Sequence, residues 1–280
     1  MSAARRSSAA PAAAPDRIAR AFATARERGE AALVTYVMGG DPDLVTSLEM
    51  ALACVRGGAD LLEIGVPFSD PIADGPTIQR AAERSLAAGT TVAQCLALAA
   101  AVRERSQTPI ALMGYVNPML AYGEERFLDD CAKAGVDALI VPDLPPEEAG
   151  RFGDLARARG VALVFLLAPT STPARRAAAC AAARGFLYYV SVAGVTGARK
   201  ALPADLAPRL AAIRAESPVP VVIGFGISTP AQAKALAPLA DGLVVGSAIV
   251  NRIAEPGSRK ARAERVERYV RSLKRATRRR

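Results

Sequence analysis

Short apolar segments and longer segments of mixed polarity alternate along the whole chain. The apolar runs predict strands at residues 31–38, 59–66, 109–115, 136–141, 161–167, 186–191, 219–223 and 242–245. Most of these runs are continuously apolar and do not alternate with polar residues. That pattern is typical of parallel strands whose two faces are both covered.

The segments between the strands have helical spacing. They predict helices at residues 16–29, 44–56, 77–86, 91–105, 124–134, 147–159, 173–183, 204–216 and 229–239, and a last basic helix after residue 247. Eight strands that alternate with helices predict an α/β fold, a (β/α)8 TIM barrel with an extra N-terminal helix. A doubly wound open sheet is the alternative, although Gly39-Gly40-Asp41-Pro42 after the first strand is not its G-x-G-x-x-G fingerprint.

We expect a single barrel domain over residues 16–275, between a disordered N-terminal tail (1–15) and a basic C-terminal tail (276–280). Polar, Gly- and Pro-rich loops follow the strands, whereas the connections from helix to strand are terse. In barrels of this kind the chemistry lies at the carboxyl ends of the strands. The asymmetry of the loops therefore predicts one functional face.

Two carboxylates stand out in residues 61–77, which read LLEIGVPFSDPIADGPT. Glu63 interrupts an apolar strand, and Asp74 lies in the loop that follows. A carboxylate in a buried strand costs several kcal/mol unless it is paired, and burial raises its pKa, which suits a general acid or base. A structural Glu63 that caps the backbone or pairs with an arginine remains the alternative.

Glycine-bearing loops after the last two strands indicate a phosphate site. Residues 224–228 read GFGIS and residues 245–248 read VGSA. Backbone N–H groups at glycines can approach an anion closely, and a helix N-terminus and the Ser247 hydroxyl would add to them. The same glycines could simply make tight turns. Residues 194–197 could form a third donor loop or a lid.

Charge and composition narrow the possible functions. The net charge of +9 lies in the ends, because residues 1–30 carry +3, residues 251–280 carry +9 and the part between them carries −3. Nucleic-acid binding through the basic ends is therefore a minor alternative. The chain has no histidine, which excludes Ser-His-Asp triads, Cys-His dyads and His-ligated zinc.

The cysteines and the lengths of the apolar runs indicate in which cellular compartment the protein is expected. The four cysteines are spaced by 41, 36 and 49 residues, which is neither metal-ligand nor redox-motif spacing. Buried reduced thiols fit a cytoplasmic protein. The first residues lack the apolar core of a signal peptide. No apolar run reaches the length of a membrane span, so we expect no membrane association.

Taken together, these motifs closely resemble those of the tryptophan synthase alpha chain family, from about Asp16 to about Ser272. The most specific match is residues 62–79, LEIGVPFSDPIADGPTIQ. Further matches are Gly40-Asp41-Pro42, Tyr115-Val116-Asn117-Pro118, Pro142-Asp143-Leu144-Pro145, Ser191 with Gly194-Val195-Thr196-Gly197, residues 224–228 and residues 246–250. The resemblance implies a barrel enzyme that cleaves indole-3-glycerol phosphate to indole and glyceraldehyde 3-phosphate without a cofactor.

The resemblance also implies roles for single residues. Glu63, Asp74 and Tyr188 match catalytic positions, and Tyr36, Met113, Ile140, Thr196 and Phe225 match substrate-binding positions. Gly197, Gly226, Gly246 and Ser247 match phosphate-binding positions. Asp70, Pro71, Asn117 and Pro118 match positions that face a beta chain, which carries pyridoxal phosphate and uses the indole. Tyr36 and Met113 replace the Phe and Leu common in other members, and both still offer apolar surface.

The residues also limit how the carbon–carbon bond could be cleaved. A Schiff base needs a lysine at a strand end, but Lys133, Lys200, Lys234, Lys260 and Lys274 all lie outside the expected strands. A metal would lack histidine ligands. We therefore expect acid–base catalysis by Glu63 and Asp74. The alternatives are another phosphosugar barrel enzyme and a non-catalytic subunit that only activates its partner.

Overall fold

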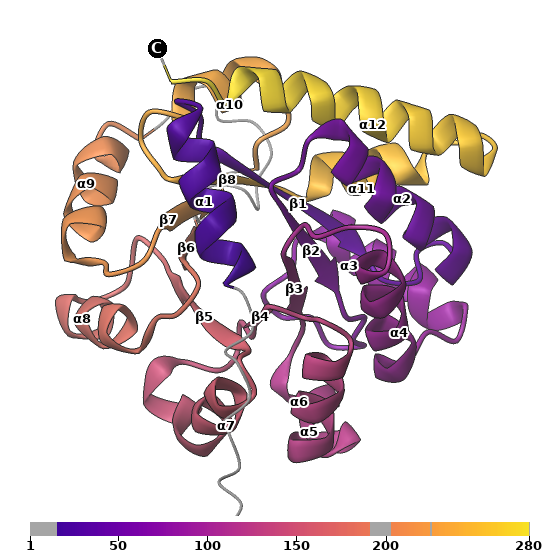
Figure 1. The fold of residues 1–280 in the computed structure, drawn as a ribbon, viewed down its shortest axis with the longest axis horizontal. Coiled ribbons are helices and arrows are strands. Elements are labelled where there is room, and N and C mark those ends of the chain that lie inside the picture. Colours follow the sequence, from indigo (N-terminus) through magenta and orange to yellow (C-terminus); the bar gives the residue numbers. More distant parts are fainter. Residues whose placement is uncertain (1–15, 191–202, 225, 280) are drawn as a thin grey trace, which may run out of the picture.

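Eight parallel strands close into a barrel in the computed structural model, which describes residues 16–190, 203–224 and 226–279. The order around the barrel follows the order along the chain (Figure 1). The strands are β1 (Ala32–Met38), β2 (Leu61–Gly65), β3 (Ile110–Met113), β4 (Ala138–Ile140), β5 (Ala162–Leu167), β6 (Leu187–Val190), β7 (Val221–Gly224) and β8 (Gly242–Val245). The predicted (β/α)8 barrel is confirmed.

Helices surround the barrel on all sides. They are α1 (Arg17–Glu27), α2 (Leu44–Gly57), α3 (Pro76–Ala87), α4 (Val92–Arg103), α5 (Val116–Tyr122), α6 (Glu124–Lys133), α7 (Pro146–Ala158), α8 (Pro173–Ala182), α9 (Leu206–Glu216), α10 (Pro230–Leu236), α11 (Ser247–Ala254) and α12 (Arg259–Ala276). Among the described residues, no single helix is long and apolar enough to cross a membrane, although the bent pair of α3 and α4 passes that test jointly.

The helices differ from the sequence prediction in two places. Helix α5 was expected to be a loop because it contains Asn117-Pro118, but Pro118 lies in its first turn, where a missing N–H costs no hydrogen bond. The last basic helix is two helices. Pro256 and Gly257, with a φ of 145° at Gly257, separate α11 from α12.

Side chains of the strands fill two apolar layers. One cluster lies inside the barrel and includes Val34, Ile140, Val164 and Val222, while Leu33 and similar residues pack outward against the helices. Because both faces are buried, most of the strands read as continuous apolar runs.

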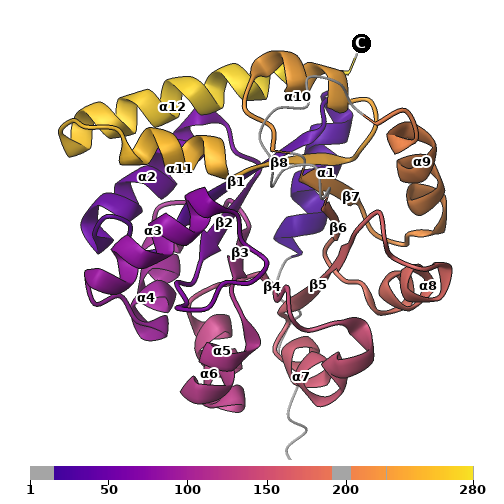
Figure 2. The same cartoon turned by 180° about the vertical axis from the view of Figure 1, so that it is seen from behind.

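Helix α1 closes the N-terminal end of the barrel. Its Ile18 and Phe22 belong to the cluster inside the barrel, and the rings of Phe22 and Phe186 lie 6.0 Å apart. The helix crosses the strands in Figure 1 and lies behind them in the reversed view of Figure 2. The open end of the barrel is therefore the one at which the strands end.

The C-terminal residues 276–279, which belong to the expected basic tail, pack against the folded body. Thr277 is fully buried, and Arg278 forms a β-bridge with Glu30. The guanidinium of Arg279 donates to the carbonyls of Ala237 and Ala240, at 3.0 and 2.6 Å. Backbone carbonyls at the ends of helices accept hydrogen bonds from arginine, so a basic segment can be part of the folded body.

Candidate active site

A cavity of about 850 Å³ opens at the carboxyl ends of the strands. Its lining includes strand residues and the loops that follow β2, β4, β5, β7 and β8. Cavities of this size are typical of small-molecule sites. The predicted functional face is thus the face that carries this cavity.

Glu63 lies on β2 with 1% of its surface exposed and lines the cavity. Its Oε2 atom has no hydrogen-bond partner within the described part of the chain. Burial raises the pKa of the Glu63 carboxyl to about 8, and the nearby charge of Asp74 adds to the shift. Glu63 is therefore protonated near neutral pH and can give a proton to a ligand.

Asp74 lies in the loop between β2 and α3 and also lines the cavity. The Tyr115 hydroxyl donates a hydrogen bond of 3.2 Å to its Oδ2 and accepts one of 2.9 Å from the N–H of Ala73. Burial raises the pKa of Asp74 to about 6, and the bond from Tyr115 opposes this shift. Asp74 is therefore mostly ionised near neutral pH.

Tyr188 and Tyr36 flank the two carboxylates. Tyr188 lies on β6, where Gly224 on the next strand makes room for it: a Cβ at Gly224 would come within 2.7 Å of the Tyr188 hydroxyl oxygen. Burial, followed by the charges of Glu63 and Asp74, raises the pKa of Tyr188 well above its ordinary value. Burial and the same carboxylates raise the pKa of Tyr36. Both hydroxyls therefore stay protonated and are available as donors.

Small and hydroxylated residues line another part of the cavity. Gly226 has a φ of 63°, in the left-handed region that favours glycine. Ser247 is the first residue of α11, directly after Gly246, and all three residues line the cavity. The free N–H groups of the first turn of α11 suit an anion.

The other substrate-binding predictions have mixed outcomes. Met113 lines the cavity, whereas Thr196, Gly197 and Phe225 lie outside the described residues. Ile140 is fully buried inside the barrel and does not line the cavity. Pro142, two residues further towards the carboxyl end of β4, lines it instead.

The residues predicted to face a partner lie at the surface. Asp70 and Pro71 are in the loop after β2, and Asn117 and Pro118 are in α5. Two exposed apolar side chains lie in the same segments: Ile72 is 83% exposed and Leu120 is 50% exposed.

Several residues of the site are absent from the sequence prediction. Tyr115 was quoted only as part of a motif, and Leu166, Arg175 and Arg252 were not singled out, although these three line the cavity. Tyr115 is the last residue of the third expected strand, at its carboxyl end, which is a usable signal; the other three carry none. Within the described ranges, no group of three or more His, Cys, Asp or Glu side chains could hold a metal ion.

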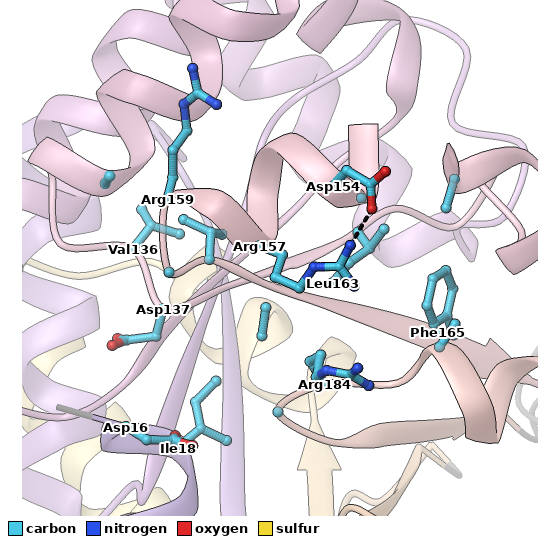
Figure 3. Close-up of a pocket in the computed structure, with 18 of the residues that line it drawn as sticks. Asp16, Ile18, Val136, Asp137, Asp154, Arg157, Arg159, Leu163, Phe165 and Arg184 are labelled. Atoms are coloured by element: carbon cyan, nitrogen blue, oxygen red, sulfur yellow. Dashed lines mark hydrogen bonds and ion pairs between the residues drawn. The ribbon is translucent and has the colours of Figure 1, made fainter. Parts of the chain in front are cut away.

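A second cavity of about 620 Å³ lies at the opposite end of the strands, between α1, α7 and α8 (Figure 3). Its carboxylates have partners: Asp137 is bound by Arg17 and Arg103, and Asp154 pairs with Arg157. It contains none of the predicted site residues.

Comparison with known proteins fixes the family. Residues 22–278 match the family described as tryptophan synthase alpha chain. This chain belongs to the tryptophan synthase alpha chain family. Members of the family are lyases that cleave indole-3-glycerol phosphate to indole and glyceraldehyde 3-phosphate in tryptophan biosynthesis. The alpha chain normally forms a complex with a beta chain.

Single relatives agree with the family match. A tryptophan synthase alpha chain from Citrifermentans bemidjiense is 56% identical over 234 residues, covering 84% of this chain and 88% of the relative. One from Pelobacter propionicus is 51% identical over 261 residues, covering 93% and 97%. A solved structure of Mycobacterium tuberculosis tryptophan synthase is 39% identical with a TM-score of 0.86, covering 94% of this chain and 98% of that one.

Proposed function

We propose that Glu63 and Asp74 carry out the family's cleavage of indole-3-glycerol phosphate in this chain by acid–base catalysis, without a cofactor. One observation supports this above all others. A buried carboxyl, Glu63, and a half-buried one, Asp74, share one cavity, and their pKa values, about 8 and about 6, lie on opposite sides of neutrality. Such a separated pair is how a site provides an acid and a base at the same pH.

Glu63 acts first as the acid and then as the base. Its protonated carboxyl gives a proton to C3 of the indole ring, which leaves the ring positively charged and its side chain ready to depart. The ionised Glu63 then takes the proton of the glycerol hydroxyl at the bond to be broken. The C–C electron pair returns to the ring, and indole and the aldehyde form. Glu63 ends protonated, so the proton balance closes.

Asp74 supports the charged intermediate. As an ionised carboxylate it accepts a hydrogen bond from the indole N–H and stabilises the positive charge on the ring. The Tyr115 hydroxyl, which donates to Asp74 at 3.2 Å, keeps the carboxylate oriented and favours its ionised form. Tyr188, whose pKa responds to both carboxylates, orients one of the two acids.

The rest of the cavity binds the two ends of the substrate. Tyr36 and Met113 provide apolar surface for the indole, and Gly226, Gly246 and Ser247 hold the phosphate through N–H groups and the serine hydroxyl. All five residues line the same cavity as the carboxylates. Thr196, Gly197 and Phe225 are proposed for the same roles from the family resemblance alone.

The beta chain would contact the loop after β2 and helix α5, through Asp70, Pro71, Asn117 and Pro118. The exposed Ile72 and Leu120 in these segments would supply the apolar part of the interface. The loop that carries Asp74 would then lie between the substrate cavity and the beta chain. We also propose a cytoplasmic location, because the four cysteines are free and buried and suit a reducing compartment.

The decisive experiment is an indole-release assay of the purified chain, with and without a beta chain. We expect Glu63→Gln to lower the cleavage rate by about 10²–10⁴-fold, the contribution of one proton shuttle. Asp74→Asn should bind the substrate but turn it over slowly. Glu83→Gln, on the exposed face of α3, is the control. Cleavage by Glu63→Gln at the control's rate would refute the mechanism.

A further inference from the structure

The charged residues of the large cavity are separated by sign. Among the described lining residues, the only acids are Glu63 and Asp74, from β2 and the loop that follows it. The only bases are Arg252, on α11, and Arg175, on α8. An anionic group of a ligand is therefore repelled by the ionised Asp74 and attracted towards one of these two helices.

Arg252 is held in one orientation by its neighbours. Its guanidinium carbon lies 3.4 Å from the centre of the Tyr269 ring, and its Nη1 donates a bond of 2.8 Å to the carbonyl of Ala248. No carboxylate in the described part of the chain pairs with it. A cation stacked on an aromatic ring is attracted by the face of that ring, and its planar group is thereby fixed.

Tyr269 links Arg252 to the loop that carries Gly226. The Tyr269 hydroxyl donates a bond of 3.0 Å to the carbonyl of Ser228, two residues after that glycine. Arg265, one helical turn earlier on α12, donates to the carbonyl of Arg252 at 3.1 and 3.2 Å. Helices α11 and α12 lie side by side in both views (Figures 1 and 2). Helix α12 therefore contacts both the loop that carries Gly226 and helix α11, which begins directly after Gly246.

We propose that Arg252 is the cationic side chain of the phosphate subsite and that Tyr269 is its positioning residue. The inference rests on the proposed function, in which Gly226, Gly246 and Ser247 hold the phosphate. Backbone N–H groups carry only partial charges, whereas a guanidinium adds a full charge and favours a dianion. Arg252 thereby selects phosphorylated over unphosphorylated ligands of the same cavity.

The test measures how Arg252→Met changes the binding of two probes that share the cavity. We expect the inhibition constant of inorganic phosphate and the KM for indole-3-glycerol phosphate to rise about tenfold, which is about 1.4 kcal/mol. The inhibition constant of indole, which has no phosphate, should stay unchanged, as should kcat within about threefold. A purely structural role would weaken both probes. Arg268→Met, on the exposed side of α12, is the matched control.

Two further variants test how Arg252 is held. Arg252→Lys keeps the charge but not the planar group, so it should recover only part of the loss in phosphate binding. Tyr269→Leu removes the stacked ring while Arg252 stays, and it should weaken phosphate binding about threefold and indole binding not at all. Phosphate binding unchanged in Tyr269→Leu would overturn the positioning role.

Ser247→Ala separates failure of this inference from failure of the proposed function. If Ser247→Ala weakens phosphate binding and Arg252→Met does not, the phosphate site stands and the role of Arg252 is overturned. If neither variant weakens it, the proposed phosphate site itself is wrong. If Arg175→Met weakens phosphate binding in place of Arg252→Met, the cation has been assigned to the wrong helix.

Discussion

The two cavities at opposite ends of the barrel both contain acidic side chains, but these differ in whether hydrogen-bond donors reach them. In the smaller cavity (Figure 3), the Asp137 carboxylate accepts bonds from Arg17 at 3.0 Å, Arg103 at 2.6 Å and the N–H of Ile110 at 2.8 Å. In the larger one, Glu63 has a buried oxygen without any such partner in the described residues. A carboxylate with several donors stabilises a fold, whereas one without donors holds a proton that chemistry can use.

Because Asp137 is paired and Glu63 is not, neutralising these two carboxylates should have opposite effects on stability. We expect the larger effect for Asp137, at the N-terminal end of the barrel. Asp137→Asn leaves Arg17 and Arg103 partly buried without their counter-charge. We expect it to lower the free energy of unfolding by about 2–4 kcal/mol. Chemical denaturation measures this loss. Asp129→Asn, which removes the partner of Arg159 near the surface, is the control.

Cleavage by the folded Asp137→Asn variant should stay near the normal kcat, because the residue lies far from the catalytic face. A large fall in kcat with unchanged stability would contradict the division of roles between the two ends.

Neutralising Glu63 should instead stabilise the protein at high pH. The pKa of Glu63 is raised from 4.5 to about 8 in the folded state. Between these values the folded state holds a proton that the unfolded state has lost, so this contribution to stability declines as the pH rises from 4.5 to 8. Glu63→Gln has no such decline.

We expect Glu63→Gln to gain about 1–3 kcal/mol over the normal chain at pH 8, and little at pH 4.5. Denaturation at the two pH values measures the difference, with Glu83→Gln as the control. An equal effect at both pH values would mean that the Glu63 pKa is not raised.

The smallest effect concerns the pH profile of kcat/KM. The proposed mechanism needs ionised Asp74 and protonated Glu63, so it predicts that the rate falls below a pH of about 6 and above about 8. Tyr115→Phe removes the hydrogen bond that opposes the rise in the Asp74 pKa. The acid limb should therefore move up by about one pH unit or less, while the alkaline limb stays. Movement of the alkaline limb alone would contradict the assignment.

Much of the fold follows from local patterns. The strands of a parallel barrel are buried on both faces, so each one is a recognisable apolar run, and the glycine- and proline-rich loops after them mark the functional face. Helix α5 was missed because Asn117-Pro118 suggests a turn, although proline is tolerated in a first helical turn. The packing of the C-terminal residues could not be predicted, because charge alone does not tell whether a carbonyl lies within reach of Arg279.

The candidate site was predictable only in part. Glu63 and Asp74 stood out because one interrupts an apolar strand and the other lies in the loop that follows it, and the loops with Gly226 and Ser247 stood out by composition. Ile140 lies deeper in the barrel than the cavity lining, where Pro142 of the loop after β4 is found, because residues along one strand differ in depth. The orientation of Arg252 depends on the Tyr269 ring of α12, and no local sequence pattern predicts that contact.

The sequence by itself therefore determined the barrel, the face that carries the large cavity and the two candidate acids, because these depend on hydrophobic periodicity and on residues close together in the chain. Tertiary structure alone decided which acids are paired. Glu63 and Asp137 both interrupt apolar runs, but the partners of Asp137 come from 34 and 120 residues away. Burial without a partner is a property of the assembled barrel, and it gives Glu63 its proton.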